Sequence, residues 1–213
     1  MADRRAIAAL FAPLVPVGAR FGAMAITGPE PALFPDEEPA VARAVAKRRR
    51  EVAFGRACAR QALGWSVAIP AGAGGAPIWP DGILGSITHT DDDAAAMVAE
   101  RGAVVALGID LESLAHAART EDLLTTVTTV AERASTDPAL PLAALAFSAK
   151  EAVYKCLYPT AGQFLDFHDV ELAIDPAGTF RVRRAHGYDP SSLIGRFAFD
   201  AAHVATVVVA LRG

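Results

Sequence analysis

The sequence contains only two cysteines, Cys58 and Cys156, among its 213 residues. Both fall on the apolar faces of segments that we expect to be helical. The pattern therefore predicts two reduced core residues rather than a disulfide or a metal-binding pair.

The sequence also lacks an uninterrupted apolar run of the ~20 residues that a membrane-spanning helix needs. The nearest approach is the run from Ala6 to Val17, which follows two arginines as in a short signal peptide. Pro13 and Pro16 interrupt it, and no small-residue cleavage site follows. We expect this run to form the first structural element, and the protein to be cytoplasmic and free of membrane contact.

An excess of positive charge is missing as well. The formal net charge is -4 and the isoelectric point is about 5.7, which argues against a general nucleic-acid binder. With 213 residues and 53% hydrophobic composition, the chain can bury a sizeable core as one globular unit or as two small lobes.

The segment from Val105 to Glu112 has the alternating pattern of a strand with two different faces. One face is an apolar stripe formed by Val105, Leu107, Ile109 and Leu111. The other is small at first and then acidic, with Ala106, Gly108, Asp110 and Glu112. Two carboxylates on one face repel unless a cation or a proton lies between them, and such oxygens suit Mg2+. An edge strand with two solvated acids is the alternative.

The segment from Leu142 to Leu157 has helical periodicity. Its predicted buried stripe consists of Leu145, Ala149, Ala152, Val153 and Cys156. Ser148, Glu151 and Lys155 share a polar edge at spacings of three and four. Alone, an acid and a base one turn apart usually form only a surface ion pair.

Together these segments resemble the signature pair of the 4'-phosphopantetheinyl transferases: Gly108-Ile-Asp110-Leu-Glu112, then Phe147-Ser-Ala-Lys150-Glu151-Ala-Val-Tyr-Lys155. The chain is most similar to the two-lobed class that serves siderophore, polyketide and nonribosomal peptide synthases. Three more stretches resemble motifs of that class, in its order: Phe54-Gly-Arg56-Ala-Cys-Ala, Pro77-Ile-Trp79-Pro80-Asp-Gly82 and Gly85-Ser86-Ile-Thr88-His89.

The resemblance implies an α+β pseudo-dimer of two similar lobes, residues 1–103 and 104–213. Each lobe would pack helices on an antiparallel sheet, with the active site in the cleft between them. The patterns agree with this class. They predict one helix over 40–63, or two joined near Gly55, and a hairpin of strands at 85–90 and 94–100 joined by a solvated Asp91-Asp92-Asp93 turn. An antiparallel meander follows, with strands at 170–174, 179–185, 195–200 and 204–211.

The activity that the resemblance implies is transfer of the 4'-phosphopantetheine arm of coenzyme A to a serine of an apo carrier protein. The acceptor would be an acyl, aryl or peptidyl carrier domain, and adenosine 3',5'-bisphosphate would be released. The metal would be Mg2+, with Mn2+ as a substitute. We expect a monomer that binds no nucleic acid.

The resemblance also assigns the site residues. Asp110, Glu112 and Glu151 would hold the metal, and Glu151, directly or through a metal-bound water, would take the serine proton. Lys155 would act in catalysis and, with His89, stabilise the pyrophosphate of coenzyme A, supported by Lys150.

Arg48 and Arg56 would grip the phosphate beside the ribose of coenzyme A. Helical geometry alone would instead pair Arg49 with Arg56. The loop at 71–76 contains no charge, whereas many relatives carry basic residues there.

Two other functions share parts of this pattern. A Mg2+-dependent hydrolase of nucleotide pyrophosphates would use water in place of the serine and need no carrier. A noncatalytic module that binds carrier protein or coenzyme A would tolerate the loss of Glu151 or Lys155.

Overall fold

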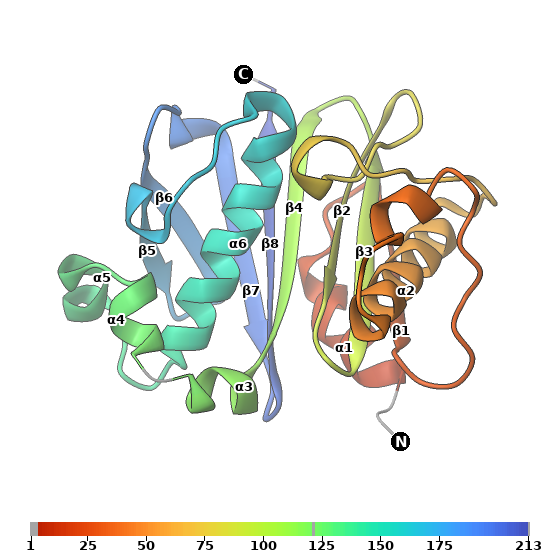
Figure 1. Ribbon diagram of the computed structural model, residues 1–213. Helices are drawn as coiled ribbons and strands as arrows, with labels where there is room; N and C mark the ends of the chain where they lie inside the picture. The colour runs from red at the N-terminus through yellow and green to blue at the C-terminus, as the bar shows by residue number, and fades with distance from the viewer. Residues whose placement is uncertain (1–3, 121, 213) are drawn as a thin grey trace. The chain divides into compact units, whose positions relative to one another are not determined.

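The computed structural model describes residues 4–120 and 122–212. It divides into two compact units, Met1–Arg101 and Gly102–Gly213. In each unit a long helix lies on an antiparallel sheet, so the predicted α+β class is confirmed (Figure 1). The domain boundary expected between 103 and 104 stays a prediction, as does the expected position of the active site.

The first unit is built on a three-stranded sheet. Its strands are β1 (Ala19–Ala25), β2 (Ile83–His89) and β3 (Asp93–Glu100), in the order β1-β3-β2 and antiparallel throughout. β2 and β3 form the predicted hairpin. The expected solvated turn is only partly correct, because Asp93 is buried and begins β3. The turn is closed by Thr90, whose hydroxyl accepts from the backbone amides of Asp92 and Asp93.

Helix α2 (Ala46–Leu63) packs on β1 and β3 and continues through Gly55 without a break. It begins six residues later than the predicted 40–63 helix, because Val45 has extended backbone angles of φ -65° and ψ 156°. The residues before it form a separate 3-10 helix, Glu38–Val41. α2 ends where Gly64 takes a left-handed conformation with φ 75°, which a glycine adopts without strain. α1 (Arg4–Phe11) lies against β1.

Glu37 ties the loop before α2 to the helix. Its side chain is buried, and its Oε1 atom accepts from Arg60 Nη1 at 2.7 Å and from the Ile69 amide at 2.8 Å. Oε2 accepts from the Phe34 amide at 2.8 Å. Glu37 is thus a buried anchor between this loop and α2.

The second unit has a five-stranded antiparallel sheet in the order β4-β8-β7-β6-β5. The predicted meander is present as β5 (Val170–Asp175), β6 (Thr179–Ala185), β7 (Leu193–Phe199) and β8 (His203–Leu211). β4 (Val104–Ser113) joins the sheet by pairing with β8. Three short helices, α3 (Leu114–Arg119), α4 (Leu123–Val127) and α5 (Val130–Ser135), lead to the long helix α6 (Leu142–Ala161).

Helix α6 contacts β4 and β8, and all five residues of its predicted stripe are fully buried. Gly108 sets how closely the helix approaches. A Cβ atom on Gly108 would lie 2.0 Å from the Ala152 carbonyl oxygen and 2.6 Å from the Cys156 nitrogen. Any larger residue at 108 would therefore push α6 away from the strand that carries Asp110.

Cys58 and Cys156 are unpaired thiols with no exposed surface, as predicted. Within the described ranges, no helix combines the length and the apolar character that crossing a bilayer requires.

Candidate active site

Strand β4 delivers Asp110 and Glu112 to one face. Asp110 is buried and Glu112 is half-buried. Burial raises the pKa of Glu112 above its usual value, and repulsion from Asp110 raises it further, while His116 and Lys155 oppose the shift. The two acids therefore do not have the fully solvated environment of the alternative interpretation.

Helix α6 adds Glu151 and Lys155. The Lys155 ammonium donates to Asp110 Oδ1 at 2.6 Å, which links the helix directly to the strand. Burial raises the pKa of Glu151, as does the negative charge of Asp110, and Lys155 partly offsets both. Four of the predicted site residues, Asp110, Glu112, Glu151 and Lys155, thus act on one another electrostatically within one unit.

Ser148 does not join this polar edge. It is fully buried, and its hydroxyl lies 2.9 Å from the Thr206 hydroxyl of β8. The helical spacing that places Ser148 beside Glu151 in the sequence is correct, but β8 covers that side of the helix.

The donor chemistry of the three carboxylates suits a hard divalent cation. A cation would also relieve the repulsion from Asp110 that raises the pKa of both Glu112 and Glu151. In the arrangement found, no three His, Cys, Asp or Glu side chains of the described residues converge as a metal-binding group. The positive charge next to Asp110 is that of Lys155. The set therefore fits Mg2+ by its chemistry, and the ligand assignment stays a prediction.

Lys150 is the predicted coenzyme A ligand whose surroundings differ most from expectation. Its ammonium is buried, donates to Glu132 Oε2 at 3.0 Å and donates to the Phe167 carbonyl at 2.9 Å. Burial lowers the pKa of Lys150, and Glu132 counteracts that shift. These contacts favour a structural role over a phosphate contact.

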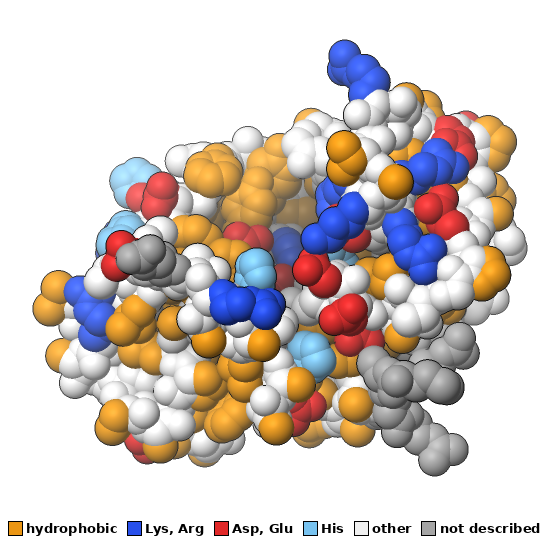
Figure 2. All heavy atoms as spheres, turned by 60° about the horizontal axis from the view of Figure 1, so that its bottom comes forward, with side chains coloured by type: hydrophobic (Ala, Val, Ile, Leu, Met, Phe, Trp, Pro, Cys, Tyr) orange, Lys and Arg blue, Asp and Glu red, His pale blue; other side chains and the backbone are white. Residues whose placement is uncertain are grey.

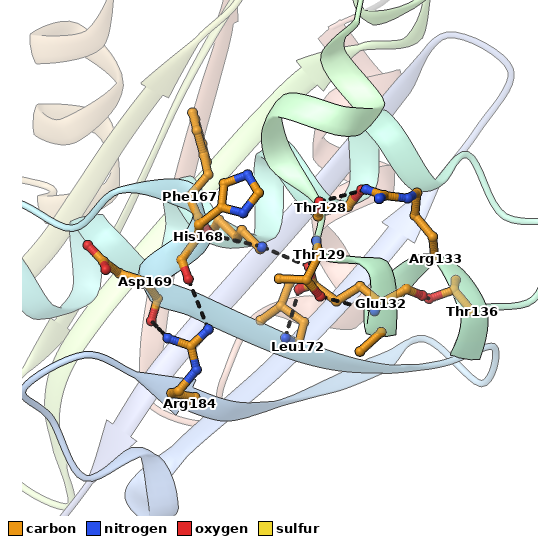
Figure 3. Close-up of polar contacts among 12 residues, drawn as sticks. Thr128, Thr129, Glu132, Arg133, Thr136, Phe167, His168, Asp169, Leu172 and Arg184 are labelled. Carbon is orange, nitrogen blue, oxygen red and sulfur yellow. Dashed lines mark hydrogen bonds and ion pairs between the residues drawn. The ribbon is translucent and has the colours of Figure 1, made fainter.

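Glu132 is a residue that the sequence analysis missed. Figure 3 shows its carboxylate between α5, α6 and β5: Oε1 accepts from the Leu172 amide at 2.8 Å, and Oε2 accepts from the Thr129 amide at 2.6 Å. The Thr129 hydroxyl accepts from the Glu132 amide in return, which completes a capping box. The spacing Thr129-x-x-Glu132 is the one sequence signal that could have indicated this helix start.

In the first unit, Arg48 and His89 come together although 41 residues separate them. Arg48 Nη1 lies 2.8 Å from His89 Nε2 and donates to Glu51 Oε2 at 3.2 Å. Arg49 is instead held by a bidentate contact with Glu38 at 2.6 and 2.8 Å. The contacts therefore group Arg48, not Arg49, with the predicted histidine.

Arg56 is also buried, and its Nε atom has no hydrogen-bond partner among the described residues. Burial lowers its pKa; Glu37 opposes this, while Arg60 and Arg48 add to it. A buried guanidinium with an unsatisfied donor is costly unless an acceptor is supplied, and an anionic ligand is one such acceptor.

Lys and Arg side chains lie among Asp and Glu side chains on the face drawn in Figure 2. At the start of α2, Lys47 pairs with Asp91 at 2.7 Å, and both side chains are exposed. The charge of Lys47 is thus paired with that of an exposed acid.

Two family models match the chain in succession. The model of the 4'-phosphopantetheinyl transferase N-terminal domain matches residues 36–99, and that of the 4'-phosphopantetheinyl transferase superfamily matches residues 106–208. The chain belongs to the 4'-phosphopantetheinyl transferase superfamily. The superfamily match contains the whole Asp110, Glu112, Glu151 and Lys155 cluster.

Named relatives agree with this assignment. The 4'-phosphopantetheinyl transferase Svp of Streptomyces mobaraensis is 44% identical over 163 residues, which cover 71% of this chain and 65% of Svp. PptT of Mycobacterium tuberculosis is 39% identical over 153 residues, covering 68% of this chain and 66% of PptT. The chain thus spans slightly less than two thirds of these relatives.

Enterobactin synthase component D of Salmonella typhimurium is 39% identical over 83 residues, 37% of this chain and 34% of that protein. A solved structure, the holo-(acyl-carrier-protein) synthase of Bacillus anthracis in complex with coenzyme A, is 21% identical with a TM-score of 0.41. It covers 52% of this chain and 98% of that one.

Proposed function

We propose that this superfamily member transfers the 4'-phosphopantetheine arm of coenzyme A to a serine of an apo carrier protein. The observation that carries the proposal is the cluster on β4 and α6, in which Lys155 bonds Asp110 at 2.6 Å next to Glu112 and Glu151. Acids and a base placed together are what a charged phosphoryl transfer requires, because positioning and electrostatics dominate that chemistry.

Glu151 is the proposed general base. The serine oxygen attacks the phosphorus that bears the pantetheine arm, and Glu151 accepts the serine proton. Its pKa is raised by burial and by Asp110. A carboxylate with a raised pKa is a stronger base.

Lys155 is the proposed partner of the leaving group. The bond that breaks joins the attacked phosphorus to the bridging oxygen, which departs with adenosine 3',5'-bisphosphate. The Lys155 ammonium can neutralise charge that develops on these oxygens. Its contact with Asp110 holds it near Glu151 before the substrate arrives.

Asp110, Glu112 and Glu151 would hold Mg2+, or Mn2+ in its place. When bound, the ion supplies positive charge to the pyrophosphate oxygens. We expect a chelator to abolish transfer and added Mg2+ to restore it.

Arg48, His89 and Arg56 are the proposed ligands of the coenzyme A phosphates. Support comes from the 2.8 Å contact of Arg48 with His89 and from the unsatisfied, buried Nε atom of Arg56. Lys150 is left out of this set because its ammonium is occupied by Glu132 and Phe167.

The proposed acceptors are acyl, aryl or peptidyl carrier domains, and the proposed setting is a cytoplasmic monomer. Relatives named as 4'-phosphopantetheinyl transferases and as an enterobactin synthase component support this kind of partner.

The test is incubation with coenzyme A, Mg2+ and a panel of apo carrier proteins, with the mass of each carrier measured afterwards. We expect at least one carrier to gain the mass of phosphopantetheine. Glu151→Gln should lower the rate by about 10² or more, as for other groups that act on transition-state charge. Glu100→Gln, which makes the same change at the exposed end of β3, is the matched control and should be fully active.

The same assay separates the alternatives. A hydrolase would consume coenzyme A and leave every carrier unmodified. A binding module would leave coenzyme A intact, and the unmodified protein and Glu151→Gln would both show no reaction.

A further inference from the structure

The basic end of α2 contains a carboxylate to which neither the sequence motifs nor the proposed mechanism assigns a role. The side chain of Glu51 is 11% exposed, whereas those of its neighbours Arg48 and His89 are 56% and 30% exposed. Glu51 therefore has the best-fixed position of the three. A buried carboxylate beside a phosphate-binding pair is unexpected, because its charge repels an anionic ligand.

The hydrogen bonds show how the three side chains are ordered. A guanidinium has donors only, so Arg48 Nη1 donates both to Glu51 Oε2 at 3.2 Å and toward His89 Nε2 at 2.8 Å. His89 Nε2 must then be an acceptor, which makes the imidazole neutral with its proton on Nδ1. Glu51 Oε2 lies 3.6 Å from Nε2, beyond hydrogen-bond range. The hydrogen-bond link between the carboxylate and the histidine therefore runs through the arginine.

Without this contact, Arg48 would keep only its contact with His89 among the described residues. Its side chain is long, flexible and mostly exposed, and other cations lie close: the positive charge of Arg48 is felt at Arg56. Ordering such a side chain costs conformational entropy and brings like charges together. Glu51 offsets both effects before any ligand binds.

We propose that Glu51 is a positioning residue, which holds Arg48 against His89 so that the two side chains form one preorganised anion-binding pair. This inference rests on the proposed function for the identity of the anion, a phosphate of coenzyme A. The negative charge of Glu51 then strengthens anion binding by positioning Arg48, and this effect exceeds the repulsion between Glu51 and the anion.

The two effects of Glu51 predict opposite outcomes, so binding measurements separate them. We expect Glu51→Ala to weaken coenzyme A binding about tenfold, the equivalent of one charge-assisted contact. Glu51→Gln should recover part of the loss, since the amide oxygen can still accept from Arg48. In turnover assays the Michaelis constant for coenzyme A should rise while kcat changes little. Tighter binding by either variant would show that repulsion dominates and would overturn the proposal.

Glu38→Ala is the matched control. It removes a carboxylate that binds the next arginine, Arg49, at 2.6 and 2.8 Å. We expect no change in coenzyme A affinity from it. An equal loss in both variants would mean that charge balance along α2 matters rather than the position of Arg48, and would refute the specific role.

A second readout needs no ligand and no transfer activity. Nitrogen chemical shifts of the His89 ring should report the neutral form with the proton on Nδ1 in the unmodified protein. In Glu51→Ala the ring should exchange between tautomers, and Arg48→Ala should have the same effect. Unchanged ring signals in a folded Glu51→Ala protein would overturn the proposal even if coenzyme A is not the substrate. Loss of transfer with the expected ring signals would instead count against the proposed function alone.

Discussion

The buried ion pair between Glu132 and Lys150 should make the fold around α6 sensitive to the loss of either charge, and Glu132→Gln tests this. Both side chains are 1% exposed and their charged atoms lie 3.0 Å apart. Removing one partner of a buried pair costs about 3–5 kcal/mol, because the other charge stays buried and uncompensated. The substitution keeps the shape of Glu132 but removes its charge.

The hydrogen bonds of Glu132 determine where in the range of about 3–5 kcal/mol the loss of unfolding free energy should lie. Its two oxygens accept from the amides of Leu172 and Thr129 as well as from Lys150. A glutamine has one oxygen and an NH2 group, so at least one of these donors loses its acceptor, at about 1–3 kcal/mol. We expect Glu132→Gln to lower the free energy of unfolding by about 4 kcal/mol, a large share of the roughly 5–15 kcal/mol typical of a domain.

The double variant Glu132→Gln, Lys150→Met should be more stable than the two single losses predict, since no unpaired charge remains. The double-mutant cycle of these variants should give a coupling free energy between Glu132 and Lys150 of about 2–3 kcal/mol. The exposed Lys47–Asp91 pair is the reference and should give a much smaller coupling, because solvent screens it. Urea unfolding followed by far-ultraviolet circular dichroism gives these values, and hydrogen exchange of the Leu172 and Thr129 amides localises the change.

The effect should depend on pH with a definite sign. Burial lowers the pKa of Lys150 below its ordinary 10.5, and Glu132 holds it up. In Glu132→Gln that support is lost, and the folded protein binds the lysine proton less well than the unfolded chain. The destabilisation should be fully present below the lowered pKa of Lys150 and shrink as pH rises toward about 10.5. A cost under about 1 kcal/mol, or one that grows with pH, would refute the account of this pair.

Three further predictions concern other parts of the molecule. Gly108→Ala should destabilise the second unit by about 1–3 kcal/mol, because the added Cβ would displace α6, and with it Glu151, from Asp110. Transfer should also be slower in the molecules that remain folded. Normal stability and a normal rate would contradict the close approach of α6 to β4. Burial raises the pKa of the thiols of Cys58 and Cys156 to about 12 from 9.0, so neither thiol should be alkylated at pH 9 unless the protein unfolds. The contribution of these thiols to stability is present below pH 9 and should fall as pH approaches 12. Rapid labelling of the native protein would disprove this. Arg56→Ala should raise the Michaelis constant for coenzyme A much more than that for 3'-dephospho-coenzyme A. Equal effects on the two donors would show that Arg56 does not bind the 3'-phosphate.

A lysine in the uncharged loop at 71–76 should partly restore the preference for coenzyme A over 3'-dephospho-coenzyme A that Arg56→Ala removes. The structure indicates where to place it. Gly74 has a left-handed backbone with φ 62°, which strains any other residue, whereas Ala73 is exposed with ordinary angles. Ala73→Lys is therefore the better variant, and its gain should be only a few-fold because solvent and salt screen an exposed contact.

The elements with a strong period were predictable from the sequence. The stripe on α6 follows from spacing alone and is buried as predicted. The alternation on β4 is only partly reflected in burial, because Val105 is half-buried whereas Gly108 and Asp110 on the opposite face are buried as well. The start of α2 was not predictable in this way, since the residues from Ala40 to Val45 are apolar enough to extend a helical pattern. Backbone angles at Val45 decide the boundary, and the sequence pattern does not encode them.

The buried acids were missed for a different reason. Glu37 bonds the amide of Ile69, and Glu132 bonds that of Leu172, 32 and 40 residues away. A charged residue in a short connecting segment is normally solvated, so only the tertiary partner shows that it is buried. Lys150 illustrates the same limit, because its motif suggests a phosphate contact while its neighbours from distant segments enclose its ammonium.

The most direct test of the central claim is a count of products. Purified protein, coenzyme A, Mg2+ and an apo carrier that becomes modified are incubated, and adenosine 3',5'-bisphosphate is quantified alongside holo carrier. Transfer predicts equal amounts of the two, and no adenosine 3',5'-bisphosphate when the acceptor serine of the carrier is replaced by alanine. Nucleotide release that continues with the alanine carrier, or that exceeds the holo carrier formed, would contradict transfer and identify a hydrolase.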